Sequence, residues 1–205
     1  QITANLAAAG NTYGVSASHF EEYRRERAEY VFFAGCVGTY STPDATKKTL
    51  RLLSALGVDF TTIDENCCGG FHRSSGFDLS EYEGAKRNIE RIAASGAKKI
   101  VTGCPHGFDV MHRCEPYRTE FRRLGVEVEH VSQLLDRIAF ETVPDDSKIA
   151  YHDPCFLGRR NGIYSEPRDL ISRLGAPPVE LAAHHDNSRC CGSPEGTFIV
   201  DPDVS

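Results

Sequence analysis

Two pairs of adjacent cysteines are the residues best suited to carry chemistry. Each pair follows a lone cysteine at a similar interval, and glycine directly follows each pair. The two groups are Cys36 with Cys67 and Cys68, and Cys155 with Cys190 and Cys191. Such self-similarity predicts a duplicated cysteine module. The glycines loosen the turn, so that both sulfurs of a pair can face one small target.

The first group gains a fourth thiol from Cys104, which follows another apolar run. Converging thiolates repel one another unless a cation or an iron–sulfur core absorbs their charge. Four are enough for a 4Fe-4S cluster. The predicted ligands, called the first cysteine set below, are Cys36, Cys67, Cys68 and Cys104. Gly69 and Gly70 leave room for backbone amides to approach the sulfides and tune the potential.

Two other uses of these thiols stay open at this point. Zinc also takes four thiolates, as a structural or assembly site, although its ligands usually come from paired C-x2-C segments. A metal-free oxidoreductase could instead cycle one adjacent pair between dithiol and disulfide, through a strained and easily reduced ring. Cys114 stands alone in the sequence and is interpreted as a buried, inert thiol.

Composition and charge exclude several classes of function. The 205 residues suffice for a sizeable core, and the net charge of −6 does not favour nucleic-acid binding. No apolar run suits a membrane-spanning helix and no signal-peptide pattern is present, which predicts a cytoplasmic protein and leaves peripheral membrane association open. The absence of glycine-rich phosphate loops and of a G-x-S-x-G elbow excludes nucleotide binding and serine hydrolysis.

Alternating strand and helix patterns predict an α/β fold with a mainly parallel sheet. Strands are expected at residues 31–34, 58–63, 98–102 and 126–131, and helices at 43–56, 80–95, 117–124 and 131–138. In such sheets, sites form beyond the carboxyl ends of the strands. The cysteine clusters are therefore expected to meet at that edge.

A sharp change of composition at residues 144–147 predicts a boundary between two βαβ-type modules. The expected divisions are a lead-in over 1–30, a first module over 31–144 and a second module over 145–205. The second module is expected to hold strands at 148–151 and 179–181, and a helix over 163–174.

The residues around the cysteines are as characteristic as the cysteines themselves. They are Phe33-Ala34-Gly35-Cys36, Cys67-Cys68-Gly69, Cys104-Pro105-His106, Tyr151-His152-Asp153-Pro154-Cys155, Leu157-Gly158-Arg159, Pro167-Arg168 and Cys190-Cys191-Gly192. From residue 31 onward the chain resembles the CCG, or cysteine-rich-domain, iron–sulfur proteins. This family includes the B and D subunits of heterodisulfide reductase and the iron–sulfur subunits of glycolate and lactate oxidases.

The resemblance implies an iron–sulfur electron-transfer subunit of a multi-subunit oxidoreductase. Its partners would be a flavoprotein or other iron–sulfur subunits, and the acceptor a disulfide, a quinone or a similar molecule. Each module of the family supplies a lone cysteine, the adjacent pair and a terminal C-x2-C. In heterodisulfide reductase, such five-cysteine sets hold non-cubane 4Fe-4S clusters.

The chain departs from that pattern in both modules. Gly107 stands where the first C-x2-C needs its last cysteine, which favours a four-thiolate cubane over a five-thiolate cluster. The second module reaches Ser205 without a C-x2-C, so its three thiols, the second cysteine set, are one ligand short. These thiols are Cys155, Cys190 and Cys191. Because the chain begins at Gln1, residues outside this sequence are the favoured source of the missing ligand, and a partner subunit is another.

Nearby side chains are the remaining candidates for that ligand: His152, Asp153, His184 and His185. Asp153 is expected to cap a turn instead. Of the two adjacent histidines, one at most is expected to reach a given metal, because neighbours on an extended segment point oppositely. His106 is expected either to donate to a cluster sulfur or to face water at the start of a helix.

Overall fold

A four-stranded parallel sheet forms the centre of the larger lobe in the computed structural model, which describes residues 2–15, 20–143, 147–175 and 177–192. The strands are β1 (Tyr30–Phe33), β2 (Phe60–Thr61), β3 (Lys99–Thr102) and β4 (Glu127–His130), in the order β2-β1-β3-β4. The register places Phe33 opposite Thr102, and Thr102 opposite His130. The predicted α/β class and parallel sheet are confirmed, so the carboxyl ends of the strands share one edge.

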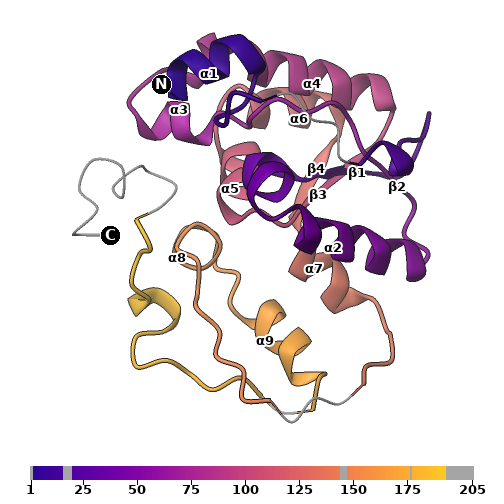
Figure 1. Cartoon of the computed structure of the whole chain (residues 1–205), viewed down its shortest axis with the longest axis vertical. Coiled ribbons are helices and arrows are strands. Elements are labelled where there is room, and N and C mark those ends of the chain that lie inside the picture. The colour runs from indigo at the N-terminus through magenta and orange to yellow at the C-terminus, as the bar shows by residue number, and fades with distance from the viewer. Residues whose placement is uncertain (1, 16–19, 144–146, 176, 193–205) are drawn as a thin grey trace.

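Helices cover both faces of this sheet, as a parallel sheet requires (Figure 1). One face carries α1 (Ile2–Ala9), α4 (Glu83–Ser95), α5 (Pro105–Arg113) and α6 (Tyr117–Leu124), and the other carries α2 (Pro43–Ala55) and α7 (Val131–Arg137). Alternation along β1 assigns its side chains to the two faces. Val31 and Phe33 pack with the first group, and Phe32 packs with the second.

Local signals define these helices as the sequence predicted. Pro43 begins α2, where its missing N–H costs nothing, and Gly96 ends α4 with a left-handed φ of 71°. The buried leucines of α2 and the buried isoleucines of α4 form the apolar stripes that hold each helix on the sheet. Shorter elements are α3 (Gly70–Ser74), a π-helical turn at Val37–Ser41 and 3-10 turns at Glu21–Tyr23, Leu79–Glu81 and His185–Asn187.

The expected lead-in contributes to the core of the larger lobe. Leu6 of α1 is 5% exposed and packs in the same cluster as Val31. The carbonyl of Gly10 accepts a hydrogen bond of 2.7 Å from the backbone N–H of Cys67. This early segment therefore helps to position the first adjacent pair.

The smaller lobe contains α8 (Gly158–Asn161) and α9 (Ser165–Ser172). Where strands at 148–151 and 179–181 were predicted, the structure has a single parallel bridge between Ala150 and Val179, so these strand predictions were too long. The lobe is attached through α9, which packs on α7. The predicted boundary falls on residues 144–146, outside the described part. Within the described residues, no helix is both long and apolar enough to cross a membrane.

Candidate functional site

The first cysteine set lies together beyond the carboxyl edge of the sheet. Cys36 follows β1, the adjacent pair follows the extended residues after β2, and Cys104 follows β3. The side chains of Cys36 and Cys67 lie close enough to interact, and so do those of Cys67 and Cys68. A Cβ placed on Gly107 would lie 3.6 Å from the Cys104 sulfur and 4.0 Å from the Cys68 sulfur. The four side chains thus converge on one place, although they come from three separate loops.

Two glycines give the adjacent pair its turn. Gly69 has a left-handed φ of 86°, and a Cβ there would lie only 2.2 Å from Leu79. A Cβ on Gly70 would lie 2.6 Å from the ring of His106. The backbone N–H of Gly69 donates to the Cys67 sulfur over 3.5 Å. Small residues therefore allow the backbone amides to reach the sulfurs, as donors that stabilise negative charge.

The side chain of Asn88, on α4, hydrogen-bonds to the backbone at the start of the first adjacent pair. Its side chain is fully buried, accepts from the N–H of Asn66 over 2.7 Å and donates to the Asn66 carbonyl over 3.0 Å. It also lies within hydrogen-bonding distance of the Cys67 carbonyl and of the Tyr117 hydroxyl, at 3.4 and 3.2 Å. Sequence reasoning missed this residue, because a lone asparagine in a helical pattern gives no signal.

Burial and mutual contact set the charge state of the first cysteine set. The thiol of Cys67 donates toward Cys36, which lowers the pKa of Cys36 and raises that of Cys67. Burial raises the pKa of Cys104 to about 12, and the negative charge of Cys68 is the second largest cause. Several thiolates at this place are therefore costly unless a bound cation or metal cluster offsets their charge.

A carboxyl group that the sequence did not reveal lies beside Cys36. Glu65 accepts from the N–H of Ala34 over 3.0 Å and from the Thr39 hydroxyl over 3.2 Å. Burial raises the pKa of Glu65 to about 8, and the negative charge of Cys36 is the second largest cause. Glu65, which follows β2, thus stabilises the loop after β1 that carries Cys36.

Two buried polar atoms near this set lack a hydrogen-bond partner: the hydroxyl of Tyr82 and Nε2 of His106, which are the only such side-chain atoms among the described residues. Their rings pack on the positions of Gly69 and Gly70. His106 is 9% exposed, which corrects the alternative that it faces water, and burial lowers its pKa to about 4. A neutral donor without a partner beside four thiols suits a bound group with acceptor atoms, such as cluster sulfides.

The spacing of the sulfurs can be compared with that of a tetrahedral zinc site. Zinc–sulfur bonds of about 2.3 Å require the sulfurs of a tetrahedral zinc site to lie about 3.8 Å from one another. In the described part of the chain, no three cysteine sulfurs lie within 4.8 Å of one another. The thiols of the first cysteine set are thus not arranged as a preformed tetrahedral zinc site. Cys114 is 7% exposed within the apolar core, consistent with an inert thiol.

The second cysteine set is less enclosed. The sulfurs of Cys155 and Cys190 lie 3.7 Å apart, and the N–H of Gly192 donates to the Cys190 sulfur over 3.4 Å. Burial raises the pKa of Cys155, and the hydrogen bond with Cys190 is the second largest cause. Cys190 and Cys191 are exposed. The structure therefore brings two of these three sulfurs into contact.

The side chains considered for the missing ligand are engaged elsewhere. Nε2 of His152 lies 2.8 Å from the Arg189 carbonyl. Asp153 is 2% exposed and, instead of simply capping a turn, pairs with Arg168 through both carboxylate oxygens at 2.7 and 2.8 Å. His184 and His185 form a group with Glu180 that contains no cysteine. The two histidines also point to the same side, which corrects the expectation that they diverge.

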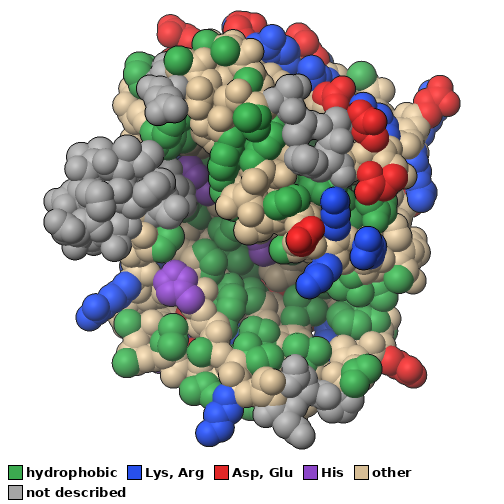
Figure 2. Space-filling model, in the orientation of Figure 1, with side chains coloured by type: hydrophobic (Ala, Val, Ile, Leu, Met, Phe, Trp, Pro, Cys, Tyr) green, Lys and Arg blue, Asp and Glu red, His purple; other side chains and the backbone are tan. Residues whose placement is uncertain are grey.

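A cavity of about 440 Å³ separates the two cysteine sets. Figure 2 shows the surface hollowed between the lobes, with hydrophobic side chains gathered there. Cys104 and His106 line the cavity from the larger lobe, and Cys155, Phe156 and Cys191 line it from the smaller one. A small molecule in this space would therefore contact both sets.

Comparisons with known proteins agree with this arrangement. The model of the cysteine-rich domain (CCG) family matches residues 30–108 and 149–204. The chain is 32% identical, over 86% of its length, to a quarter (25%) of the EtfAB:quinone oxidoreductase of Syntrophomonas wolfei. It is 33% identical, over 88% of its length, to 46% of the D subunit of the dihydromethanophenazine:CoB–CoM heterodisulfide reductase of Methanosarcina barkeri.

The B subunit of the fumarate reductase (CoM/CoB) of Methanothermobacter marburgensis is 30% identical over 85% of the chain, which covers 35% of that protein. These relatives are named as oxidoreductases or as their subunits. The chain spans between a quarter and about half of their length.

Proposed function

The chain belongs to the cysteine-rich CCG family, and from this premise we propose that it is an iron–sulfur electron-transfer part of a multi-subunit oxidoreductase, similar to heterodisulfide reductase. The observation that carries the proposal is the convergence of the four thiols of the first cysteine set on one edge of the sheet. Their types and number suit an iron–sulfur cluster.

The first cysteine set would hold one 4Fe-4S cluster, which when bound supplies a carrier for single electrons. The chain's own groups would orient and tune it. The N–H groups of Gly69 and Gly107 donate to the Cys67 and Cys104 sulfurs over 3.5 and 3.3 Å, and so stabilise charge on them. Asn88 and Glu65 hold the loops that present the thiols.

The second cysteine set would hold a second cluster, with its fourth ligand from outside the described residues. The contact between Cys155 and Cys190 supports this role, as does Cys191 at the cavity wall. Residues 31–144 and 145–205 would then be two modules, each with its own redox site. A flavoprotein or iron–sulfur partner would supply electrons.

The acceptor would bind in the cavity between the two cysteine sets, and a disulfide, a quinone or a similar molecule fits its mixed lining. Phe156 supplies an apolar wall, and the neutral His106 a polar one. An acceptor there would be within contact of both sites, which shortens the path that an electron must cross.

Metal and sulfide analysis tests the proposal. Protein purified or reconstituted without oxygen is expected to contain iron and acid-labile sulfide in equal amounts, near four of each per cluster. The reduced sample should give a paramagnetic resonance signal. Zinc without sulfide would replace the proposal with a structural zinc module. Neither metal, together with a reducible disulfide in the Cys67–Cys68 pair, would replace it with a dithiol enzyme.

A further inference from the structure

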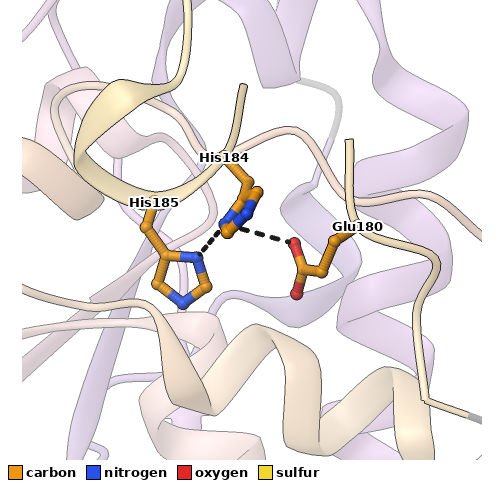
Figure 3. Close-up of side chains that lie close together, drawn as sticks. All are labelled: Glu180, His184 and His185. Carbon is orange, nitrogen blue, oxygen red and sulfur yellow. Dashed lines mark hydrogen bonds and ion pairs between the residues drawn. The ribbon is translucent and has the colours of Figure 1, made fainter. Parts of the chain in front are cut away.

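Three side chains of the smaller lobe bring metal-binding atoms together away from the cysteines. Glu180, His184 and His185 each offer one such atom, and the three atoms lie within 4.8 Å of one another (Figure 3). The two Nδ1 atoms of the histidines are 2.6 Å apart, and Nδ1 of His184 is 3.9 Å from Oε2 of Glu180. Nothing in the proposed electron-transfer function accounts for this cluster.

The backbone at His185 creates the cluster. His184 is extended, with φ −135° and ψ 172°, whereas His185 has a left-handed φ of 53°. His185 is the one non-glycine residue with a positive φ in the described part of the chain. This conformation is uncommon for a residue with a large side chain and needs support from its surroundings. The N–H of His185 provides that support, by donating to Asp153 over 2.7 Å.

We propose that Glu180, His184 and His185 form a site for one divalent transition metal of the zinc class. Two imidazole nitrogens and one carboxylate oxygen are a ligand set that zinc accepts, and three protein ligands leave one position open for water or another ligand. The metal takes the place of the hydrogen bond that now joins the two nitrogens, and of the contact of 3.5 Å between Nη2 of Arg168 and Nδ1 of His185. Tetrahedral zinc needs these nitrogens about 3.3 Å apart, so the side chains must separate by less than about 1 Å.

Arg168 orients the carboxylate of this site. Its guanidinium donates to both oxygens of Glu180, at 2.6 and 2.9 Å, and to both oxygens of Asp153, at 2.7 and 2.8 Å. Each oxygen of Glu180 accepts one of these hydrogen bonds and keeps a further lone pair for a metal. One arginine and two carboxylates leave a net negative charge, so the arginine does not exclude a cation. Hydrogen-bonded supports of this kind fix the direction of a ligand.

The position of the site in the chain gives it a structural consequence. The two histidines precede the Cys190–Cys191 pair. Between the histidines and this pair, the hydroxyl of Ser188 donates to the Asp153 carbonyl over 2.9 Å. A metal that joins Glu180 to His184 and His185 closes the short loop between them. Since metal affinity adds to the stability of the segment that it orders, residues 180–190 should become more protected when the site is filled.

Zinc titration of three variants tests the site. His184→Ala removes one ligand, and His185→Asn removes another while asparagine still accepts the left-handed backbone. His112→Ala is the matched control, since His112 is an exposed histidine on α5 of the larger lobe. The full chain is titrated with zinc against a chromophoric chelator, and with cobalt by absorption. Hydrogen exchange over residues 180–190 is followed with and without zinc.

The wild type and His112→Ala are expected to bind one zinc more per chain than either ligand variant, or to bind it at least about 10–100-fold more tightly. The cobalt absorption bands that the wild type shows and the two ligand variants lack should contain no thiolate-to-metal charge transfer. Zinc should slow hydrogen exchange over residues 180–190 only in the proteins that keep both histidines.

Equal zinc number and affinity in all four proteins would overturn the proposal. A cobalt difference spectrum dominated by thiolate bands would also overturn it, by assigning the metal to cysteines. Both results are independent of iron and sulfide content, so failure here is distinguishable from failure of the proposed function.

Discussion

The imidazole of His106 stacks on the phenyl ring of Phe156, with the ring centroids 4.2 Å apart. His106 lies two residues after Cys104, and Phe156 directly follows Cys155. Close by, Arg160 and Asn161 of the smaller lobe donate to the buried carboxylate of Asp109 over 3.0 and 2.9 Å. Contacts made beside the cysteines themselves therefore set the distance between the two cysteine sets.

Replacing His106 with phenylalanine should lower the reduction potential of the first site. The His106→Phe variant keeps the stack on Phe156 but removes the neutral N–H that could stabilise added negative charge. The midpoint potential is expected to fall by roughly tens of millivolts, since one hydrogen bond contributes about 1 kcal/mol. Redox titration measures the potential, and the free energy of unfolding serves as the control. An unchanged potential in a stably folded variant would show that the imidazole only fills space.

A cysteine at position 107 should act as a fifth thiolate. A Cβ on Gly107 would lie 3.6 Å from the Cys104 sulfur and 4.0 Å from the Cys68 sulfur, without a backbone clash. The Gly107→Cys variant is expected to change the paramagnetic resonance spectrum of the iron site. Gly103→Cys is the control, because its Cβ would face Val131 at 3.9 Å. A wild-type spectrum with the new thiol free to react in Gly107→Cys would contradict this.

Replacing Asn88 should reduce iron binding more than an equally destabilising replacement elsewhere on α4 does. Asn88→Ala leaves the backbone of Asn66 and Cys67 without buried partners, which should cost about 2–4 kcal/mol of unfolding free energy. Ile92→Ala, on the same helix and fully buried, should cost about 2–5 kcal/mol without touching the pair. Iron per folded chain should fall in the first variant and stay normal in the second. Equal iron content in both would limit Asn88 to a general structural role.

The convergence of the first cysteine set could be predicted from the sequence, because alternating strand and helix patterns place the carboxyl ends of parallel strands at one edge. The supports of that site could not. Asn88 and Glu65 act through backbone groups of distant segments, and no spacing in the sequence links them. The interpretation of His184 and His185 was wrong for a local reason, since it assumed an extended backbone where His185 is left-handed.

The pH dependence of stability should report on His130, which begins α7. Nδ1 of His130 accepts from the Ser132 N–H over 3.2 Å, and Nε2 lies 3.2 Å from the Gly103 carbonyl, just before Cys104. Burial lowers the pKa of His130 to about 4, from 6.5 for an ordinary histidine. The unfolded chain thus binds the proton first, and stability is lost as the pH falls from 6.5 to 4, by about 3 kcal/mol for this group.

His130→Asn is the matched variant, because asparagine also caps helices but does not titrate in this range. Its unfolding free energy, measured with denaturant at several pH values, should fall less steeply than that of the wild type between pH 6.5 and 4. Parallel curves for the two proteins would show that His130 does not carry this proton linkage.

Iron content after single cysteine-to-serine replacements tests the central claim most directly. Cys36→Ser, Cys67→Ser, Cys68→Ser and Cys104→Ser should each lose iron and sulfide or change their resonance signal. Cys114→Ser removes a thiol that lies buried in the apolar core, and it should keep the wild-type content and signal. Full iron and an unchanged signal in all four variants of the first cysteine set would contradict the account.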